Sequence, residues 1–407
     1  MNVVEELPDD CTTLDLTDPR TFQRYDRNEM WRRLRAERPV FWHPPGSGRP
    51  GFWVLTRHAD IMEVYRDNRR FTSERGNVLT TLLAGGDSAA GKMLAVTDGA
   101  RHKRLRNVML RVFSPRFLES VEQRVREMAR RLLGGAVEQG GCDFARDVAE
   151  KIPMGTICYL LGIPESDQDL LLKLTKSALS SDHENASESS AVWARNEILL
   201  YFLDLLDGVR KNPREGIISG LANGREDEGK LSDEEIVFNC YSLIIGGDET
   251  SRMSMIGAIP ALAEHPAQWA LLRSGEVGVD TAAEEVLRWT TPAMHFGRTA
   301  VEEVTIGSHT VRPGEIVTLW NSSANRDERV FADPDRFLLA RTPNRHLTFG
   351  YGPHFCIGAY LGRAEVAAVL DALRSRVVDL AVTSEPRRVH SNFLDGISSL
   401  PVSFTAG

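Results

Sequence analysis

The stretch at residues 349–358, FGYGPHFCIG, constrains this chain most, because it sets a single cysteine among glycines. Glycine permits backbone angles that other residues resist, so several N–H groups can point at the sulfur of Cys356 and favour its thiolate. Gly358 also lets the helix expected at residues 359–373 lie close to whatever the sulfur holds. A thiolate in such a loop is a good single ligand for a large, flat metal cofactor. Most free cysteines, however, are small buried hydrophobes, so packing is the alternative interpretation of Cys356.

Composition and charge exclude several classes of protein. The 407 residues are 42% apolar, which allows a large core, and the net charge of −8 argues against a nucleic-acid binder. The five cysteines form no C-x-x-C pair, so neither a zinc site nor a disulfide framework is expected. The N-terminus has no signal-peptide pattern, and no run approaches the roughly 20 apolar residues of a membrane span. We therefore expect a cytoplasmic protein that binds neither nucleic acid nor membrane.

Helical periodicity dominates the chain and predicts a mainly α protein. Amphipathic patterns recur through residues 99–290 and again at 358–376. Short β-like runs lie mainly at residues 39–56 and 299–320, which predicts a small β-rich subdomain. No repeat or linker divides the chain, so we expect one domain over residues 1–407.

One long helix is expected over residues 232–265. Ser232 and Glu235 form a capping-box signature at its start, and a proline ends the pattern. Such a helix is on the order of 50 Å long. Its middle, residues 244–251, has two adjacent glycines that would let a flat cofactor or an oxygen molecule approach the backbone, and Thr250 can bond back to an upstream carbonyl. A tolerated kink with solvent-facing charges is the alternative.

Two further pairs share a face of a predicted helix. Glu285 and Arg288 lie three apart and can form an ion pair, although an isolated pair at this spacing contributes only roughly 0.2–0.5 kcal/mol. His102 and Arg106 lie four apart in a basic helix, where they can grip a carboxylate. A basic run is otherwise usually a solvated face.

The cysteine loop, the motif at residues 246–250 and the Glu285–Arg288 pair resemble, in the same order, the motifs of the cytochrome P-450 family. The pattern F-G-x-G-x-H-x-C-x-G is among the more specific short signatures, and the similarity runs over nearly the whole chain. The resemblance implies a cytochrome P-450 fold with haem between the long central helix and the cysteine loop. It further implies that Cys356 is the proximal ligand of the haem iron and that Glu285 and Arg288 form a buried structural pair.

The resemblance also implies a haem-thiolate monooxygenase, which inserts one oxygen atom from dioxygen into an organic substrate. Thr250 would donate a hydrogen bond to bound dioxygen, and Glu249 would relay protons through water. Asp248, at the variable position of the motif, is not expected to take part. The cofactor is haem b, and the family pattern places the following residues against its iron, ring or propionates: His102, Arg106, Gly246, Arg298, Phe349, His354, Cys356 and Gly358.

By the same resemblance, the substrate meets mostly apolar side chains: Leu79, Leu82, Met93, Leu94, Ile245, Met294, His295, Phe296 and Phe393. The apolar segment within residues 76–92 is interpreted as part of a mobile flap, with a plain surface loop as the alternative. Residues 285–294 are similar to bacterial members of secondary-metabolite pathways, some of which hydroxylate amino or aryl acids tethered to a carrier protein. Such a substrate is one hypothesis for this chain. His295 can orient a polar substrate group or can simply be packed.

Electrons must come from outside the chain, because it has no G-x-G-x-x-G fingerprint and no spare length for a flavin domain. The resemblance points to NAD(P)H as the source, through a ferredoxin reductase and a ferredoxin, and to a monomeric enzyme. Basic residues can steer the acidic carrier or can simply be solvated: Arg101, Lys103, Arg104, Arg111 and Arg363.

Three other functions stay open at this point. A haem-thiolate peroxygenase would use peroxide directly, although it needs no Glu249–Thr250 relay. A haem-binding sensor or scaffold would not turn over, and the intact acid–alcohol pair disfavours it. The third is a helical protein without haem. A red purified protein, with the displaced Soret band of thiolate ligation in its ferrous–CO adduct, would exclude it.

Overall fold

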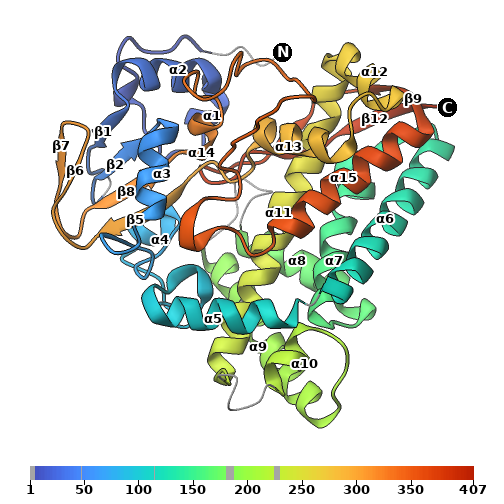
Figure 1. Cartoon of the computed structure of the whole chain (residues 1–407), viewed down its shortest axis with the longest axis horizontal. Helices are drawn as coiled ribbons and strands as arrows, with labels where there is room; N and C mark the ends of the chain where they lie inside the picture. The colour runs from blue at the N-terminus through green and yellow to red at the C-terminus, as the bar shows by residue number, and fades with distance from the viewer. Residues whose placement is uncertain (1–4, 47, 114, 180–187, 224–229) are drawn as a thin grey trace.

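Helices make up most of the molecule (Figure 1). The computed structural model describes residues 5–46, 48–113, 115–179, 188–223 and 230–407. The α-helices in these ranges are α1 (Thr21–Arg24), α2 (Arg27–Glu37), α3 (His58–Arg66), α4 (Leu79–Leu83), α5 (Gly99–Val112), α6 (Pro115–Glu138), α7 (Lys151–Leu161), α8 (Gln168–Leu179), α9 (Glu188–Lys211), α10 (Ile217–Ala222), α11 (Asp233–Glu264), α12 (Pro266–Ser274), α13 (Val279–Thr290), α14 (Asn321–Ala324) and α15 (Ala359–Arg376). The predicted fold class, mainly α with a smaller β part, is confirmed.

A mixed five-stranded sheet forms the larger β part. Its strands, in spatial order, are β1 (Val40–His43), β2 (Phe52–Leu55), β8 (Ile316–Leu319), β5 (Phe296–Ala300) and β3 (Phe71–Thr72). Strands β2 and β8 run parallel, and the other neighbours are antiparallel. The hairpin of β6 (Val304–Ile306) and β7 (His309–Val311) lies between β5 and β8 in the chain. The sheet therefore joins the front of the chain to the segment that follows α13.

The sequence analysis missed a second sheet. Strand β12 (Pro401–Ala406) pairs on its two sides with β4 (Gly141–Asp143) and β9 (Val377–Val382), all antiparallel. The short pair of β10 (Arg387–Arg388) and β11 (Ile397–Ser399) lies in the same C-terminal segment. Strand β4 interrupts residues 99–290, which we predicted as helical. Its three residues are too few to show a period-two pattern, and its partner strand β12, where Pro401 pairs with Asp143, lies at the far end of the chain.

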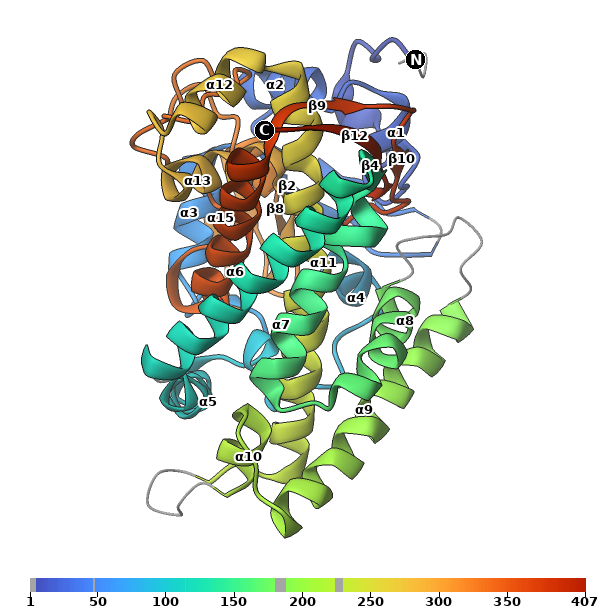
Figure 2. The ribbon, with the colours of Figure 1, turned by 90° about the vertical axis from the view of Figure 1, so that its right-hand side faces the viewer.

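The long predicted helix is confirmed as α11, which has 32 residues and is therefore about 48 Å long. The Ser232 hydroxyl accepts from the N–H of Glu235 at 3.2 Å, and the Glu235 carboxylate accepts from the N–H of Ser232 at 2.9 Å. Helix α12 begins at Pro266, directly after the C-cap His265. Figure 2 shows α11 running through the middle of the molecule. None of the helices in the described ranges combines the length and apolar character that crossing a membrane requires.

The largest apolar core surrounds α11. Buried side chains of α6, α7, α9, α13 and α15 pack with those of α11 in one cluster. A second cluster lies between the five-stranded sheet, α2 and α4, and contains Leu79 and Leu82. Residues 76–92, which we interpreted as a mobile flap or a surface loop, thus contain a short helix whose leucines are buried in this core.

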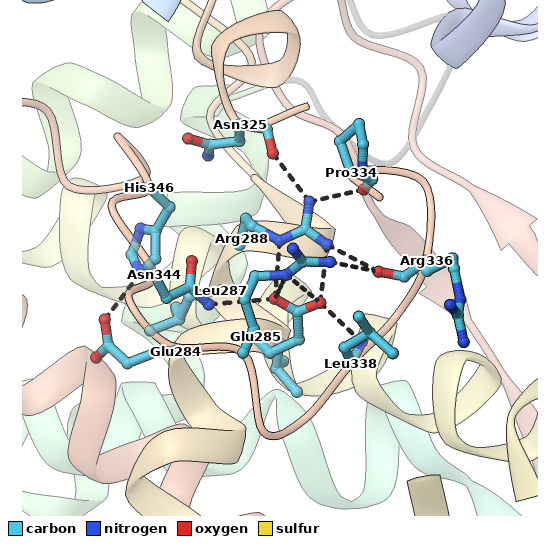
Figure 3. Close-up of polar contacts among 12 residues, drawn as sticks. Glu284, Glu285, Leu287, Arg288, Asn325, Pro334, Arg336, Leu338, Asn344 and His346 are labelled. Atoms are coloured by element: carbon cyan, nitrogen blue, oxygen red, sulfur yellow. Dashed lines mark hydrogen bonds and ion pairs between the residues drawn. The ribbon is translucent and has the colours of Figure 1, made fainter. Parts of the chain in front are cut away.

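A buried ion pair fastens α13 to the segment that follows the five-stranded sheet (Figure 3). Arg288 Nε and Nη2 each lie 2.8 Å from a carboxylate oxygen of Glu285, and both side chains are fully buried. Arg288 Nη1 donates to the carbonyl oxygens of Asn325 and Pro334, both at 2.9 Å. Nη2 also donates to the carbonyl of Arg336 at 3.2 Å.

The Glu285 carboxylate accepts from three further donors. Arg341 Nε lies 3.1 and 3.2 Å from its two oxygens, the N–H of Leu338 donates at 2.9 Å, and Asn344 Nδ2 donates at 3.1 Å. A buried charge costs several kcal/mol in desolvation unless it is paired and hydrogen-bonded. Because its partners come from residues 325–344, the Glu285–Arg288 pair holds that segment, which leads to the cysteine loop, against α13.

Replacing Arg288 by leucine should lower the free energy of unfolding by about 3–5 kcal/mol, because the buried Glu285 charge loses its main partner. The matched control is Arg32→Leu, since Arg32 pairs with Glu29 at the same i,i+3 spacing but at the surface, where a pair contributes about 0.2–1 kcal/mol. Urea unfolding followed by circular dichroism measures both variants. Equal urea midpoints for the two would contradict this role of the buried pair.

Candidate active site

The cysteine loop depends on glycine at two positions. Gly350 and Gly352 have φ angles of +67° and +72°, a region that other residues rarely adopt. A Cβ on Gly352 would also lie 2.4 Å from the carbonyl oxygen of Tyr65 in α3. The N–H of Cys356 donates to the carbonyl of Phe349 at 3.0 Å. This bond closes the loop at the cysteine.

Cys356 is an exposed residue whose thiol is nonetheless closely surrounded by protein. Cys356 is exposed, but burial raises the pKa of its thiol. The N–H of Gly358 hydrogen-bonds the sulfur, and this bond opposes the effect of burial on the pKa, as do the charges of Arg106 and Arg363. The two observations agree if the sulfur lies on the wall of an internal opening rather than on the outer surface.

The middle of α11 is open at Gly246. This residue lies in the central helix, yet it is exposed, and a Cβ added to it would meet no atom within 4 Å. Thr250, one turn later, donates from an accessible hydroxyl to the carbonyl oxygen of Gly246 at 2.9 Å, the back-bond that its position in the helix predicts. Residues four apart share a helix face, so the open space lies beside the Thr250 hydroxyl.

Helix α11 and the cysteine loop approach each other at Gly362 of α15. A Cβ on Gly362 would lie 3.3 Å from the Phe349 ring and 3.6 Å from the Ser251 hydroxyl. Phe349 begins the cysteine loop and Ser251 follows Thr250. Because Gly362 has no side chain, the cysteine loop and the open segment of α11 can approach each other closely.

Four predicted propionate ligands gather from distant parts of the chain. The His102 and His354 rings lie with their centroids 4.3 Å apart. Burial lowers the pKa of both histidines, to about 4 for His102, and the nearby charges of Arg106 and Arg298 act in the same direction. These mutual effects mean that the four side chains lie within electrostatic reach of one another.

Asp98 belongs to the same cluster and was not predicted. Its carboxylate lies 2.7 Å from His354 Nε2, and it also accepts from the Thr72 hydroxyl at 2.7 Å and from the N–H of Ser73 at 2.6 Å. The sequence signal was limited to its position before α5, which suggests an N-cap. In the structure Asp98 makes no side-chain cap bond.

The cluster has unpaired donors for an acidic ligand. Among the described residues, His102 Nε2 is buried without a hydrogen-bond partner. Arg298 is also buried; its Nη1 donates to the carbonyl of Gly297 at 2.7 Å, and its guanidinium lies 5.4 Å from the centroid of the Tyr65 ring. Such donors suit carboxylates like the two propionates of haem. Together with the exposed Cys356 and the open face at Gly246, these residues fit a haem group.

Glu249 has a partner that the sequence analysis missed. Glu249 and Arg252 are both buried, and Arg252 Nη2 lies 2.5 Å from a Glu249 oxygen. Arg252 Nη1 lies 3.7 Å from Glu150. The signal was present, because residues 249–252 repeat the E-x-x-R spacing of residues 285–288. Glu249 is therefore held by an ion pair on its own helix.

The neighbouring Asp248 has a different environment. It is fully buried and accepts a hydrogen bond from the Thr175 hydroxyl of α8 at 3.2 Å, while its other oxygen has no partner among the described residues. Burial, followed by the charge of Glu249, raises the pKa of Asp248 well above its ordinary value. The two adjacent carboxyl groups are thus distinguished by their partners, with Asp248 favoured in its neutral form.

The predicted substrate-lining residues differ in accessibility. Ile245, Phe296 and Phe393 are half-buried, and the rings of Phe296 and Phe393 lie 5.8 Å apart. The other predicted members are buried: Leu79, Leu82, Met93, Leu94, Met294 and His295. His295 packs with its ring 4.4 Å from Trp320, neither ring nitrogen has a hydrogen-bond partner among the described residues, and burial lowers its pKa to about 3.

Sequence comparisons relate the chain to known proteins. The family model described as Cytochrome P450 matches residues 279–376. Cytochrome P450 NovI of Streptomyces niveus is 50% identical over 398 residues, which cover 98% of each chain. Steroid C26-monooxygenase of Mycolicibacterium smegmatis is 32% identical, over 98% of this chain and 95% of that protein.

Solved structures agree with this relationship. P450 OxyD, which is involved in the biosynthesis of vancomycin-type antibiotics, is 35% identical with a TM-score of 0.87, over 97% of this chain and 100% of that chain. P450BioI, solved in complex with an acyl carrier protein ligated to hexadec-9Z-enoic acid, is 28% identical with a TM-score of 0.82, over 93% and 98% of the two chains. The resemblance inferred from the three motifs is confirmed, and the chain belongs to the cytochrome P450 family of monooxygenases.

Proposed function

We propose that Cys356 is the thiolate ligand of haem b in this monooxygenase, and that the enzyme oxidises an intermediate of natural-product biosynthesis. The observation that carries the ligand assignment is Cys356 itself, an exposed residue whose thiol is crowded by protein, in a loop that meets the open segment of α11 at Gly362. When bound, thiolate-ligated haem supplies the activation of dioxygen and the oxygen insertion. The protein is proposed to act as a monomer in the cytoplasm.

His102, Arg106, Arg298 and His354 are proposed to hold the haem propionates. The unpartnered His102 Nε2 and the buried Arg298 support this role. Because His354 Nε2 donates to the Asp98 carboxylate, the Nδ1 atom of that ring can donate to a propionate only when the imidazole is protonated. Gly246, Phe349 and Gly358 would border the haem ring. The two glycines leave room for it by their small size, and Phe349 does so by its flat side chain.

Thr250 and Glu249 are proposed to handle protons. The Thr250 hydroxyl gives up only one hydrogen bond, to the Gly246 carbonyl, when it turns its proton toward a ligand in the opening. Glu249 would pass protons from water as a general acid. Arg252 binds one oxygen of this carboxylate, so the proposed relay competes with this ion pair for Glu249.

Electrons are proposed to come from NAD(P)H through a ferredoxin reductase and a ferredoxin. Of the basic residues expected to steer the carrier, Arg101 and Arg363 are engaged in ion pairs, with Glu235 and Glu284 respectively. The other three expected residues lie on the exposed face of α5, where an acidic carrier can approach them: Lys103, Arg104 and Arg111.

The substrate is proposed to be an amino or aryl acid tethered to a carrier protein. The half-buried, mostly aromatic lining at Phe296 and Phe393 suits an aryl group. The relationship to P450 OxyD, which is involved in the biosynthesis of vancomycin-type antibiotics, supports the pathway class, and the relationship to P450BioI, which was crystallised with a loaded acyl carrier protein, supports the form of the substrate.

Replacing Cys356 by alanine should abolish the displaced Soret band of the ferrous–CO adduct, because alanine provides no thiolate. Cys142→Ala is the control, since Cys142 is partly buried and lies in β4, away from the loop. Absorption spectra of the reduced, CO-treated proteins measure the effect. A normal displaced band in Cys356→Ala would refute the ligand assignment.

Replacing Thr250 by alanine should divert electrons to hydrogen peroxide and lower the yield of product per NAD(P)H severalfold, because the proton donor is lost. Thr290→Val is the control, since Thr290 makes the same back-bond to the carbonyl four residues earlier, at 2.8 Å in α13. Unchanged coupling in Thr250→Ala would remove its proton role. Full-rate turnover of the wild type with peroxide alone would favour a peroxygenase instead.

A carrier-bound substrate should bind the haem protein at least about tenfold more tightly than the same free acid, a difference of about 1.4 kcal/mol. Titration of the spin-state shift with free and carrier-loaded amino and aryl acids measures the two affinities. The unloaded carrier protein is the control. Tight binding of a free acid with no shift from any loaded carrier would overturn the carrier hypothesis and leave the monooxygenase assignment standing.

A further inference from the structure

Glu284 takes part in a second polar network, separate from the one around its neighbour Glu285. One carboxylate oxygen lies 2.9 Å from His346 Nε2 (Figure 3), and the other lies 2.5 Å from Arg363 Nε. Arg363 Nη2 adds a contact of 3.3 Å. Burial opposes the ionisation of Glu284, but the bonds from His346 and Arg363 outweigh it and lower the pKa to about 2. Glu284 is therefore a carboxylate that joins α13, the segment before the cysteine loop and α15.

The hydrogen bonds of His346 define its tautomer. Glu284 can only accept, so His346 Nε2 carries the proton, and Nδ1 accepts from the N–H of Thr348 at 3.3 Å. A neutral imidazole satisfies both bonds. His346 thus orients the Glu284 carboxylate through its Nε2–H, and the fixed charges of the network are those of Glu284 and Arg363.

The positively charged guanidinium of Arg363 lies against the cysteine loop. Its guanidinium carbon lies 4.5 Å from the centroid of the Phe349 ring, within the range of a cation–π contact. Nη1 lies 3.4 Å from the carbonyl oxygen of Ala359, at the start of α15. The Phe349 carbonyl in turn accepts the N–H of Cys356. The cation is therefore stacked on the residue that anchors the cysteine.

We propose that Glu284 and Arg363, with His346 as the orienting group, are positioning residues that set the reduction potential of the haem held by Cys356. The inference rests on the proposed ligation by Cys356 and goes beyond it. Reduction adds one electron and no proton to the haem–thiolate unit, so a fixed positive charge near the sulfur favours the reduced form. Glu284 partly offsets the charge of Arg363 and fixes the position of its guanidinium. The Phe349 ring, which the guanidinium contacts, links that position to the cysteine loop.

This role differs from steering an acidic electron carrier. The Arg363 side chain is 37% exposed, but its Nε and Nη2 are turned inward to Glu284. A charge that is already paired contributes less to long-range attraction than a free one. The geometry therefore assigns Arg363 to the haem rather than to the approaching protein.

Four variants separate an electrostatic role from a structural one: Arg363→Gln, Glu284→Gln, the double variant and Arg374→Gln. Arg374 is the matched control, because it lies on the same helix and pairs with Asp371 at 2.9 Å. The haem midpoint potential is measured by stepwise reduction with dithionite and followed by absorption. The ferrous–CO band of each variant reports whether the thiolate ligand is intact.

Arg363→Gln should lower the one-electron reduction equilibrium constant by about three- to tenfold, where tenfold corresponds to 59 mV. Glu284→Gln should raise it, and the double variant should lie between the two. Arg374→Gln should leave it within about twofold of the wild type. Opposite shifts are the signature of the network's charge, since damage to the loop moves both single variants in the same direction.

Shifts of the same sign in both single variants, or shifts no larger than that of Arg374→Gln, overturn the inference while the displaced CO band keeps the Cys356 assignment intact. A wild-type protein without that band overturns both. If Arg363→Gln does not retain haem, a raised potential in Glu284→Gln with the displaced CO band intact supports the inference, and an unchanged or lowered potential overturns it.

Discussion

The hydrogen bonds to the buried carboxylate of Glu285 are the interactions on which the position of the cysteine loop depends. It is a fully buried charge, and it is stable only because Arg288, Arg341, Asn344 and the N–H of Leu338 all donate to it. Arg288 lies in α13, whereas the other three donors lie within a long irregular segment that has little secondary structure of its own. The segment ends at the cysteine loop. The hydrogen bonds that offset the desolvation cost of the Glu285 charge thus also set the position of the cysteine loop, which starts several residues later.

Sequence patterns were most informative where the chemistry is local. The capping box of Ser232 and Glu235, the proline after His265 and the glycines of residues 349–358 each act within a few positions, and the structure has them as expected. The family motifs were equally readable, since their residue types and order are specific. The Thr250 back-bond follows from helix geometry alone.

What could not be predicted is mostly long-range. Asp98 meets His354 across 256 positions, and no local pattern marks either as the partner of the other. Strand β4 has three residues and depends on β12 at the far end of the chain. The burial of Leu79 and Leu82 also depends on tertiary packing. An apolar run beside glycines is compatible with either a mobile loop or a packed helix, so its sequence alone does not distinguish them. Arg252 is the exception, since its spacing from Glu249 was visible and was not used.

The separation of the site residues along the chain has a consequence for how the enzyme is made. Asp98 and His102 precede α6, Thr250 lies in α11, Arg298 lies in β5, and Cys356 follows all of them. During synthesis the ribosome has therefore released most of the polypeptide before the sulfur emerges. The proposed haem site is complete only at that late stage, so the nascent chain has to avoid aggregation until the cofactor arrives.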